Sequence, residues 1–186
     1  MYSPERLAPT RFHRLCRVAA HVPSTMLEQR CRVRVLEFDE GADRRLTGQA
    51  EIRLQSVAES ASPAACRDLG RDLAADAPLT ALLVMGDGSA RRSAAAPGYL
   101  DDRAEPFDTW VEQALRDGDL AALAAVDPDL ARDLLAAGRP AWQVLAAALT
   151  SVDLTANARP RTRILYSAAP LGVAYLVATL DPAPSE

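Results

Sequence analysis

The sequence predicts an α/β fold of three layers, with a mostly parallel or mixed central sheet and helices on both of its faces. The chain has 186 residues, of which 49% are hydrophobic and 25% charged, so it is long enough for one domain with a substantial core. One segment, "LTALLVMG", is apolar throughout, as expected for a strand at the buried centre of a sheet. Strand and helix patterns follow one another along the chain, which favours the layered α/β class.

Five segments carry strand patterns. Basic and apolar side chains alternate in "RVRVLEF", and a similar alternation in "EIRLQSV" indicates a second half-exposed strand. Near the C-terminus, two apolar segments flank a Pro-Leu-Gly turn, which is typical of two strands joined by a short connection. The predicted strands span 32–38, 51–57, 79–86, 162–167 and 172–180.

Helical patterns occupy much of the remaining chain. The clearest one has Ser62 as its N-cap, Pro63 at the first helical position and Pro78 beyond its end. Later helices are separated by Asp-Gly-Asp, Asp-Pro-Asp and Gly-Arg-Pro, which are capping or stopping signals. The predicted helices, including a loosely patterned first one, span 7–20, 63–75, 105–117, 119–125, 128–137 and 140–150.

The composition excludes several functions. All 21 basic residues are arginine, so chemistry that needs a lysine amine, such as a Schiff base or a Walker-type phosphate site, is absent. The net charge of −4 gives no reason to expect nucleic acid as a partner. No apolar run approaches membrane-spanning length, so we expect no membrane partner, whereas a homo-oligomer stays possible.

The cysteines and the domain boundary give two further expectations. Cys16, Cys31 and Cys66 are odd in number and form no CxxC motif, which favours a reduced cytoplasmic setting without a disulfide framework or zinc site. Cys66 is expected to be a small buried hydrophobic residue. Residues 1–50 are expected to be an atypical N-terminal segment, either part of the same domain or poorly ordered, and residues 51–186 the α/β domain.

The loop after the apolar strand, "GDGSARR", is the first candidate for a site, because ligands of open α/β folds bind at strand ends. A carboxylate, a hydroxyl, backbone N–H groups and guanidinium groups could hold a small anionic ligand there. Alternatively the loop is a structural turn, with glycines at positive φ and arginines paired with Asp101 or Asp102. The candidate ligand-binding residues, of which Arg91 is the first choice, are Gly86, Asp87, Gly88, Ser89, Arg91, Arg92 and Tyr99.

Four segments in this order carry a family resemblance: "SVAESASPAACRDLGRDLA", "LLVMGDGSARRSAAAPGYLDDRAEPFD", "ALRDGDLAALAAVDPDLARDLLAAGRPAWQVLAAAL" and "ILYSAAPLGVAYLVATL". With them the chain resembles the class III extradiol ring-cleavage dioxygenase family, of the ring-opening dioxygenase superfamily that includes the Memo-like proteins. The resemblance implies an α/β oxidoreductase fold. In catalytic members two histidines and a carboxylate hold a non-haem Fe(II), and a histidine in a "G-D-x-S-H" loop moves protons for a catecholic substrate.

The chain departs from this pattern where catalysis would need it. Ala90 occupies the position of the proton-shuttling histidine, so no catalytic residue is expected. The only histidines, His13 and His21, stand in no Pro-His-Pro context, and eight residues separate them, too many for one helix face. The resemblance therefore implies an extradiol-dioxygenase-like protein without ring cleavage and without an assigned cofactor.

Two alternatives stay open. One is an active non-haem Fe(II) dioxygenase acting on a catecholic aromatic, with His13, His21 and an unidentified carboxylate as the metal ligands. The other is a small-molecule anion-binding protein that uses the 86–92 loop without chemistry. The ligand itself, aromatic or anionic, is not specified by the sequence.

Overall fold

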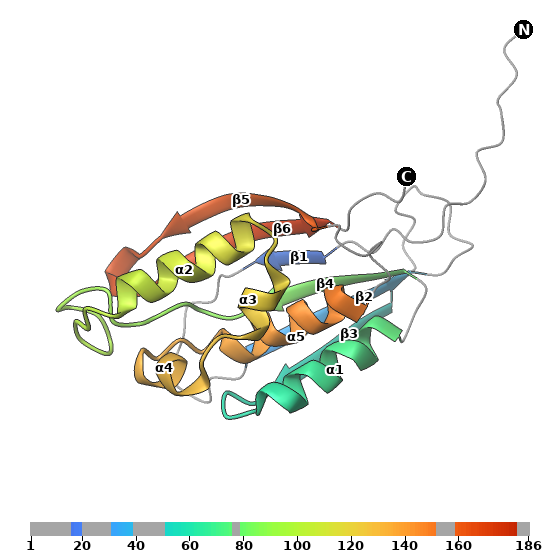
Figure 1. The fold of residues 1–186 in the computed structure, drawn as a ribbon, viewed down its shortest axis with the longest axis horizontal. Helices are drawn as coiled ribbons and strands as arrows, with labels where there is room; N and C mark the ends of the chain where they lie inside the picture. Colours follow the sequence, from blue (N-terminus) through green and yellow to red (C-terminus); the bar gives the residue numbers. More distant parts are fainter. Residues whose placement is uncertain (1–15, 20–30, 39–50, 76–78, 152–158, 182–186) are drawn as a thin grey trace, which may run out of the picture.

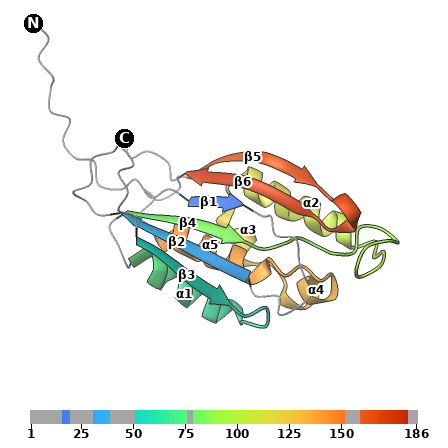
Figure 2. The ribbon, with the colours of Figure 1, turned by 180° about the vertical axis from the view of Figure 1, so that it is seen from behind.

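A computed structural model of the chain describes residues 16–19, 31–38, 51–75, 79–151 and 159–181. Six strands form one sheet in the order β3-β2-β4-β1-β6-β5. The described helices all lie against one face of this sheet, as the two opposite views in Figures 1 and 2 show. The described part is therefore a mixed α/β fold with one layer of helices, and helices on the second face are not among the described residues.

The strand directions differ from the prediction of a mostly parallel sheet. β4 and β1 pair in parallel, whereas β2 pairs antiparallel with both β3 and β4, and β6 pairs antiparallel with both β1 and β5. The described sheet is thus mixed, which was the second of the two sheet types expected, and mostly antiparallel. The strands are β1 Cys16–Ala19, β2 Cys31–Phe38, β3 Glu51–Val57, β4 Leu79–Met85, β5 Arg161–Ala168 and β6 Tyr175–Asp181.

The first predicted helix, at 7–20, is wrong where the structure describes it. Residues 16–19 form β1, in which Val18 pairs with Val84 of β4 on one side and with Ala178 of β6 on the other. Pairing with two strands overrides the weak helical spacing, because apolar periodicity in a short segment cannot separate a strand from a helix. Residues 7–15 and 20 lie outside the described residues.

The later helices fall where the sequence predicted them, with small shifts at their ends. The largest difference is in the 128–137 segment, where the helix stops early because Leu135 adopts a positive φ of 56°. The helices are α1 Pro63–Ala75, α2 Ala104–Arg116, α3 Leu120–Ala124, α4 Pro128–Asp133 and α5 Arg139–Ser151. The expected turn between the last strands is a 3₁₀ turn, Pro170–Gly172.

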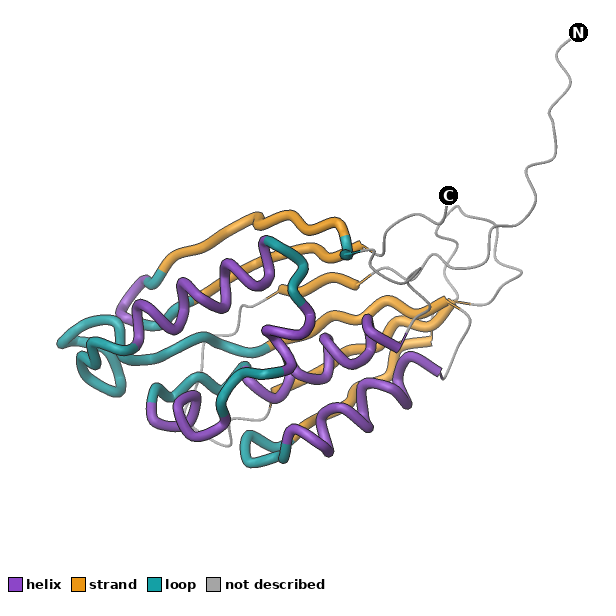
Figure 3. The backbone as a smooth tube through the Cα atoms, in the orientation of Figure 1, coloured by secondary structure: helices purple, strands orange, loops and turns teal. Residues whose placement is uncertain are grey.

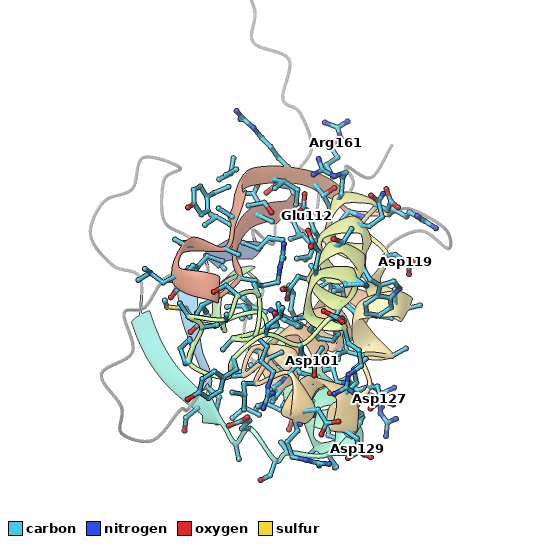
Figure 4. The ribbon with its side chains drawn as sticks, turned by 90° about the vertical axis from the view of Figure 1, so that its left-hand side faces the viewer. Asp101, Glu112, Asp119, Asp127, Asp129 and Arg161 are labelled. Carbon is cyan, nitrogen blue, oxygen red and sulfur yellow. The ribbon has the colours of Figure 1, made fainter. Side chains whose placement is uncertain are left out.

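Two of the predicted capping signals form as expected. The Asp119 side chain accepts a hydrogen bond from Ala122 N–H at the start of α3, and Asp127 accepts from Asp129 and Leu130 N–H groups at the start of α4. Figure 4 shows both aspartates on the helical side of the molecule. Each cap satisfies donors that the first helical turn leaves free, so these short helices have defined starts.

Helix α5 lies at the centre of the core. It packs against α1, α3 and the strands β2 and β4, and ten of its thirteen residues are buried. A helix enclosed in this way carries apolar or small side chains on nearly all sides, as "RPAWQVLAAALTS" does. Cys66 of α1 is fully buried, as expected. No described helix is long and apolar enough to span a bilayer.

A long loop, residues 86–103, connects β4 to α2 (Figure 3). It begins with the "GDGSARR" segment and ends at the exposed residues Tyr99 and Leu100. The loop therefore joins the end of a central strand to the helix that packs against β5 at the edge of the sheet. This position makes it the structural frame of the candidate site.

Candidate functional site

The 86–92 loop is held in place mainly by its own backbone. The N–H groups of Gly88, Ala90 and Arg92 donate to the carbonyl oxygens of Ala174, Leu134 and Gly172, at 2.9, 3.0 and 3.0 Å. In return Ala174 N–H donates to the Ser89 carbonyl at 2.8 Å. These bonds fasten the loop to the turn before β6 and to the end of α4, so their N–H groups are already used within the protein.

Close packing explains the glycines of this loop. A Cβ atom at Gly86 would lie 2.4 Å from the Cα of Gly138, and one at Gly88 would lie 2.8 Å from the Cβ of Ala174. Neither glycine has a positive φ, although positive φ was the reason expected for them. The glycines instead let two backbones approach each other more closely than a side chain would allow.

Asp108 on α2 is the side chain that joins this loop to a helix. Its Oδ1 accepts from Ser89 N–H at 2.9 Å, and its Oδ2 accepts from Ser89 Oγ at 2.6 Å and from Arg92 Nη1 at 3.3 Å. Arg92 Nη2 also donates to Glu105 at 3.1 Å. The Ser89 side chain is fully buried by this arrangement, so the serine and Asp108 form a charge-assisted contact between loop and helix.

A cavity of about 200 Å³ lies beside this contact. Its wall comes from the start of the loop, from one side of α2, from α5 and from the turn between β5 and β6. The polar or aromatic residues among its lining are Arg92, Asp108, Thr109, Glu112, Trp142, Ser167 and Tyr175. A cavity of about 150 Å³ can hold a benzene molecule, so this one has room for a ligand of about one ring.

Glu112 and Ser167 face each other across one part of this cavity. Ser167 Oγ donates to Glu112 Oε2 at 2.6 Å, and Glu112 Oε1 accepts from Arg116 one turn further along α2. Figure 4 shows Glu112 between α2 and the last strands. The contact therefore places a carboxylate and a hydroxyl oxygen, both hydrogen-bond acceptors, at the cavity wall.

Tyr175 and Trp142 contribute aromatic surface to the same cavity. Burial, and secondly the nearby Asp87 carboxylate, raise the pKa of the Tyr175 hydroxyl, so it stays protonated at neutral pH. Trp142 is almost fully buried and packs against Phe107 with ring centroids 6.4 Å apart. The cavity thus has a rigid aromatic wall and a neutral phenol at its edge.

The structure distributes the predicted site residues unevenly. Gly86, Gly88 and Arg92 line the cavity, whereas Asp87, Ser89, Arg91 and Tyr99 are not among its lining residues. The Tyr99 side chain is 74% exposed at a φ of 59°. Arg91 Nε is buried and has no hydrogen-bond partner among the described residues.

The expected pairing of the loop arginines with Asp101 or Asp102 is only partly seen. Asp101 accepts two bonds from the Arg103 side chain and one from its backbone N–H, and these bonds lower its pKa to about 2. Arg91 adds only a weak attraction to the same carboxylate. Arg92 pairs instead with Asp108 and Glu105.

No group of three His, Cys, Asp or Glu side chains that could hold a metal occurs among the described residues. Both metal candidates, His13 and His21, lie outside the described residues. Ala90 carries no titratable side chain, and its backbone N–H and carbonyl bond Leu134 and Gly98. The described donors around the cavity therefore do not fit the Fe(II) site that the resemblance implies.

Sequence reasoning missed four of the cavity residues. Asp108 stands in the "FD" of the family-like segment, which was the available signal, but nothing local marked it as the partner of Ser89. Glu112 and Ser167 are 55 residues apart, and Trp142 and Tyr175 come from different elements. Their assembly depends on the sheet order, which the sequence did not reveal.

Comparison with models of known protein families finds no match to this chain. Comparison with curated proteins finds no match either. The function is therefore inferred from the cavity, from the loop beside it and from the resemblance described above.

Proposed function

We propose that this chain is a small-molecule-binding domain that resembles the class III extradiol dioxygenases and lacks their ring-cleavage activity. The observation that carries the proposal is the cavity of about 200 Å³ beside the "GDGSARR" loop, where an alanine replaces the proton-shuttling histidine of that family. Binding needs the shaped, partly apolar wall that this cavity has. Ring cleavage needs a proton carrier and metal ligands, which the described lining does not supply.

The two alternatives have less support. Anion binding by the 86–92 loop is weakened because the N–H groups at positions 88, 89, 90 and 92 donate to protein acceptors. Iron-dependent catalysis depends on His13 and His21, and it is supported by the resemblance alone. Binding without chemistry uses only groups that the cavity presents.

Oxygen consumption tests the absence of ring cleavage. The full chain is reconstituted anaerobically with Fe(II) and then mixed with oxygen and a panel of catechols. We expect no oxygen uptake above that of Fe(II) in buffer. Stoichiometric uptake with a ring-opened product would overturn this part of the proposal, and its loss in a His13→Ala, His21→Ala double variant would assign the metal ligands.

A cavity-filling variant tests the binding function. Thermal-shift screening of the full chain with single-ring compounds is expected to identify ligands, and Ala169→Leu, at the cavity wall, is expected to abolish their effect. Ala121→Leu, an exposed change on α3 outside the cavity, is the matched control and should leave the shifts unchanged. Ligands that bind Ala169→Leu as well as the natural chain would contradict the proposal.

A further inference from the structure

The charged groups around the cavity are mainly acidic. Arg92, Asp108 and Glu112 line it, and Glu105 and Arg116 are bonded to them from outside. Asp87 is close enough to Tyr175 at the cavity wall to raise the pKa of its hydroxyl. Four carboxylates are thus opposed by two guanidinium groups, which gives the cavity a negative potential.

The arginine at the cavity wall is already neutralised. Arg92 donates to Asp108 through one terminal nitrogen and to Glu105 through the other, at 3.3 and 3.1 Å. An anionic ligand would have to compete with these two carboxylates for the guanidinium group. It would also meet the Glu112 carboxylate across the cavity, so the arrangement disfavours anions.

Glu112 is the carboxylate with acceptor capacity to spare. Each carboxylate oxygen can accept two hydrogen bonds, and the structure gives each Glu112 oxygen one, from Ser167 or from Arg116. Asp108 is more nearly saturated, because its two oxygens already accept three bonds. Arg116 is half exposed, so solvent screens its effect on the Glu112 charge.

The remaining wall suits the body of an organic cation. The Trp142 ring offers an aromatic surface, and Val111, Leu115 and Leu176 add apolar contacts. Aromatic rings attract cations and pack well against ligand rings. The volume limits the ligand to about the size of one ring.

We propose that the cavity binds a small organic cation, an amine carried on a body of about one ring, with Glu112 as its counter-charge. The ammonium group donates to Glu112 and to the Ser167 hydroxyl oxygen, and the ring lies toward Trp142. This inference rests on the proposed small-molecule-binding function, and it replaces the aromatic or anionic ligand that the sequence left open. No bond is made or broken in this binding.

Three probes of equal size and different charge test the inference. Benzylamine, benzyl alcohol and benzoate are titrated into the full chain at neutral pH, and binding is followed by calorimetry or by ligand-observed NMR. We expect benzylamine to bind most tightly and benzoate least. Glu112→Gln is expected to weaken benzylamine about fivefold while changing benzyl alcohol by less than about twofold, because only the charged ligand loses its partner.

Two further variants control for unspecific electrostatics. Asp72→Asn removes an equal charge from an exposed position on α1 outside the cavity, and benzylamine binding should not change. Arg116→Gln removes the competing guanidinium group, and benzylamine should bind more tightly. Weaker benzylamine binding to Asp72→Asn as large as that of Glu112→Gln would show a general charge effect and overturn the inference.

The remaining outcomes separate this inference from the proposed function. If benzyl alcohol or benzoate binds as tightly as benzylamine, and Ala169→Leu abolishes this binding, the cavity binds ligands but the preference for cations is wrong. If none of the three probes binds, the single-ring-binding function itself is contradicted, and the inference with it. If Glu112→Gln leaves benzylamine affinity unchanged, Glu112 is not the counter-charge.

Discussion

Arg139 at the start of α5 and Arg92 at the cavity both join distant segments, but their surroundings differ. The Arg139 residue is only 4% exposed and donates to neutral acceptors: the carbonyls of Glu59 and Ala61 and the Gln143 side chain. The Arg92 side chain is 23% exposed and pairs with two carboxylates. A guanidinium group can therefore be held by backbone carbonyls inside the core or by acids at a cavity edge.

The difference shows which contact supports packing and which supports the site. Arg139 reaches 78 residues back along the chain to Ala61, and Gln143 continues the network by donating to the carbonyls of Ala124 and Val126. This buried network ties the segment before α1 and the end of α3 to α5. Arg92 instead fixes the position of one loop against α2, beside the cavity.

The largest expected effect is at Arg139. In Arg139→Met the carbonyls of Glu59 and Ala61 and the Gln143 amide oxygen lose their donor inside the core. We expect the free energy of unfolding to fall by about 3 kcal/mol, since unpaired buried polar groups are costly. Urea denaturation measures it, with Arg159→Met at an exposed position as control. A loss below about 1 kcal/mol would mean that the network does not support the core in this way.

The glycine contact beneath the cavity comes next. Gly86→Ala places a Cβ 2.4 Å from Gly138 Cα, a backbone atom that cannot rotate away. We expect a loss of about 2 kcal/mol in the free energy of unfolding, typical of an overpacked site. Gly86→Val should lose more than Gly86→Ala when both are measured by urea denaturation. Equal stability of Gly86→Ala and the natural chain would show that this approach of loop and α5 is not tight.

The same glycine shows the limit of prediction from sequence. The "GDGS" turn was recognisable from local residues, but its true reason is the approach of Gly138, 52 positions further along the chain. Asp119 and Asp127 were predictable as caps because a cap is decided within three residues. Strand direction and the pairing of Glu112 with Ser167 were not, because they depend on which distant strands become neighbours.

Asp108 provides the third test, at the cavity side of the comparison. Asp108→Asn replaces one acceptor oxygen by an amide donor, so it cannot accept from Ser89 N–H, Ser89 Oγ and Arg92 together. We expect a loss of about 1.5 kcal/mol in the free energy of unfolding, because charge-assisted bonds to a partly buried loop are lost. Glu105→Gln, which also loses a carboxylate partner of Arg92 but at an exposed position, is the matched control and should lose less than about 0.5 kcal/mol. Equal losses in the two variants would show that burial does not distinguish these carboxylates.

The smallest effect is expected at a third arginine, Arg103, whose side chain is 55% exposed. Its bonds to Asp101 lower the pKa of that carboxyl from the ordinary 3.8 to about 2. Because the folded chain holds the ionised form more strongly than the unfolded chain does, this contribution is complete above about pH 4 and is lost as the pH falls toward 2. The free energy of unfolding should therefore fall less steeply over this range in Asp101→Asn than in the natural chain, and added salt should reduce the difference because the pair is exposed. Identical pH profiles would show that the exposed pair contributes nothing, and a difference as large as that of Arg139→Met would mean that exposure does not rank the three arginines.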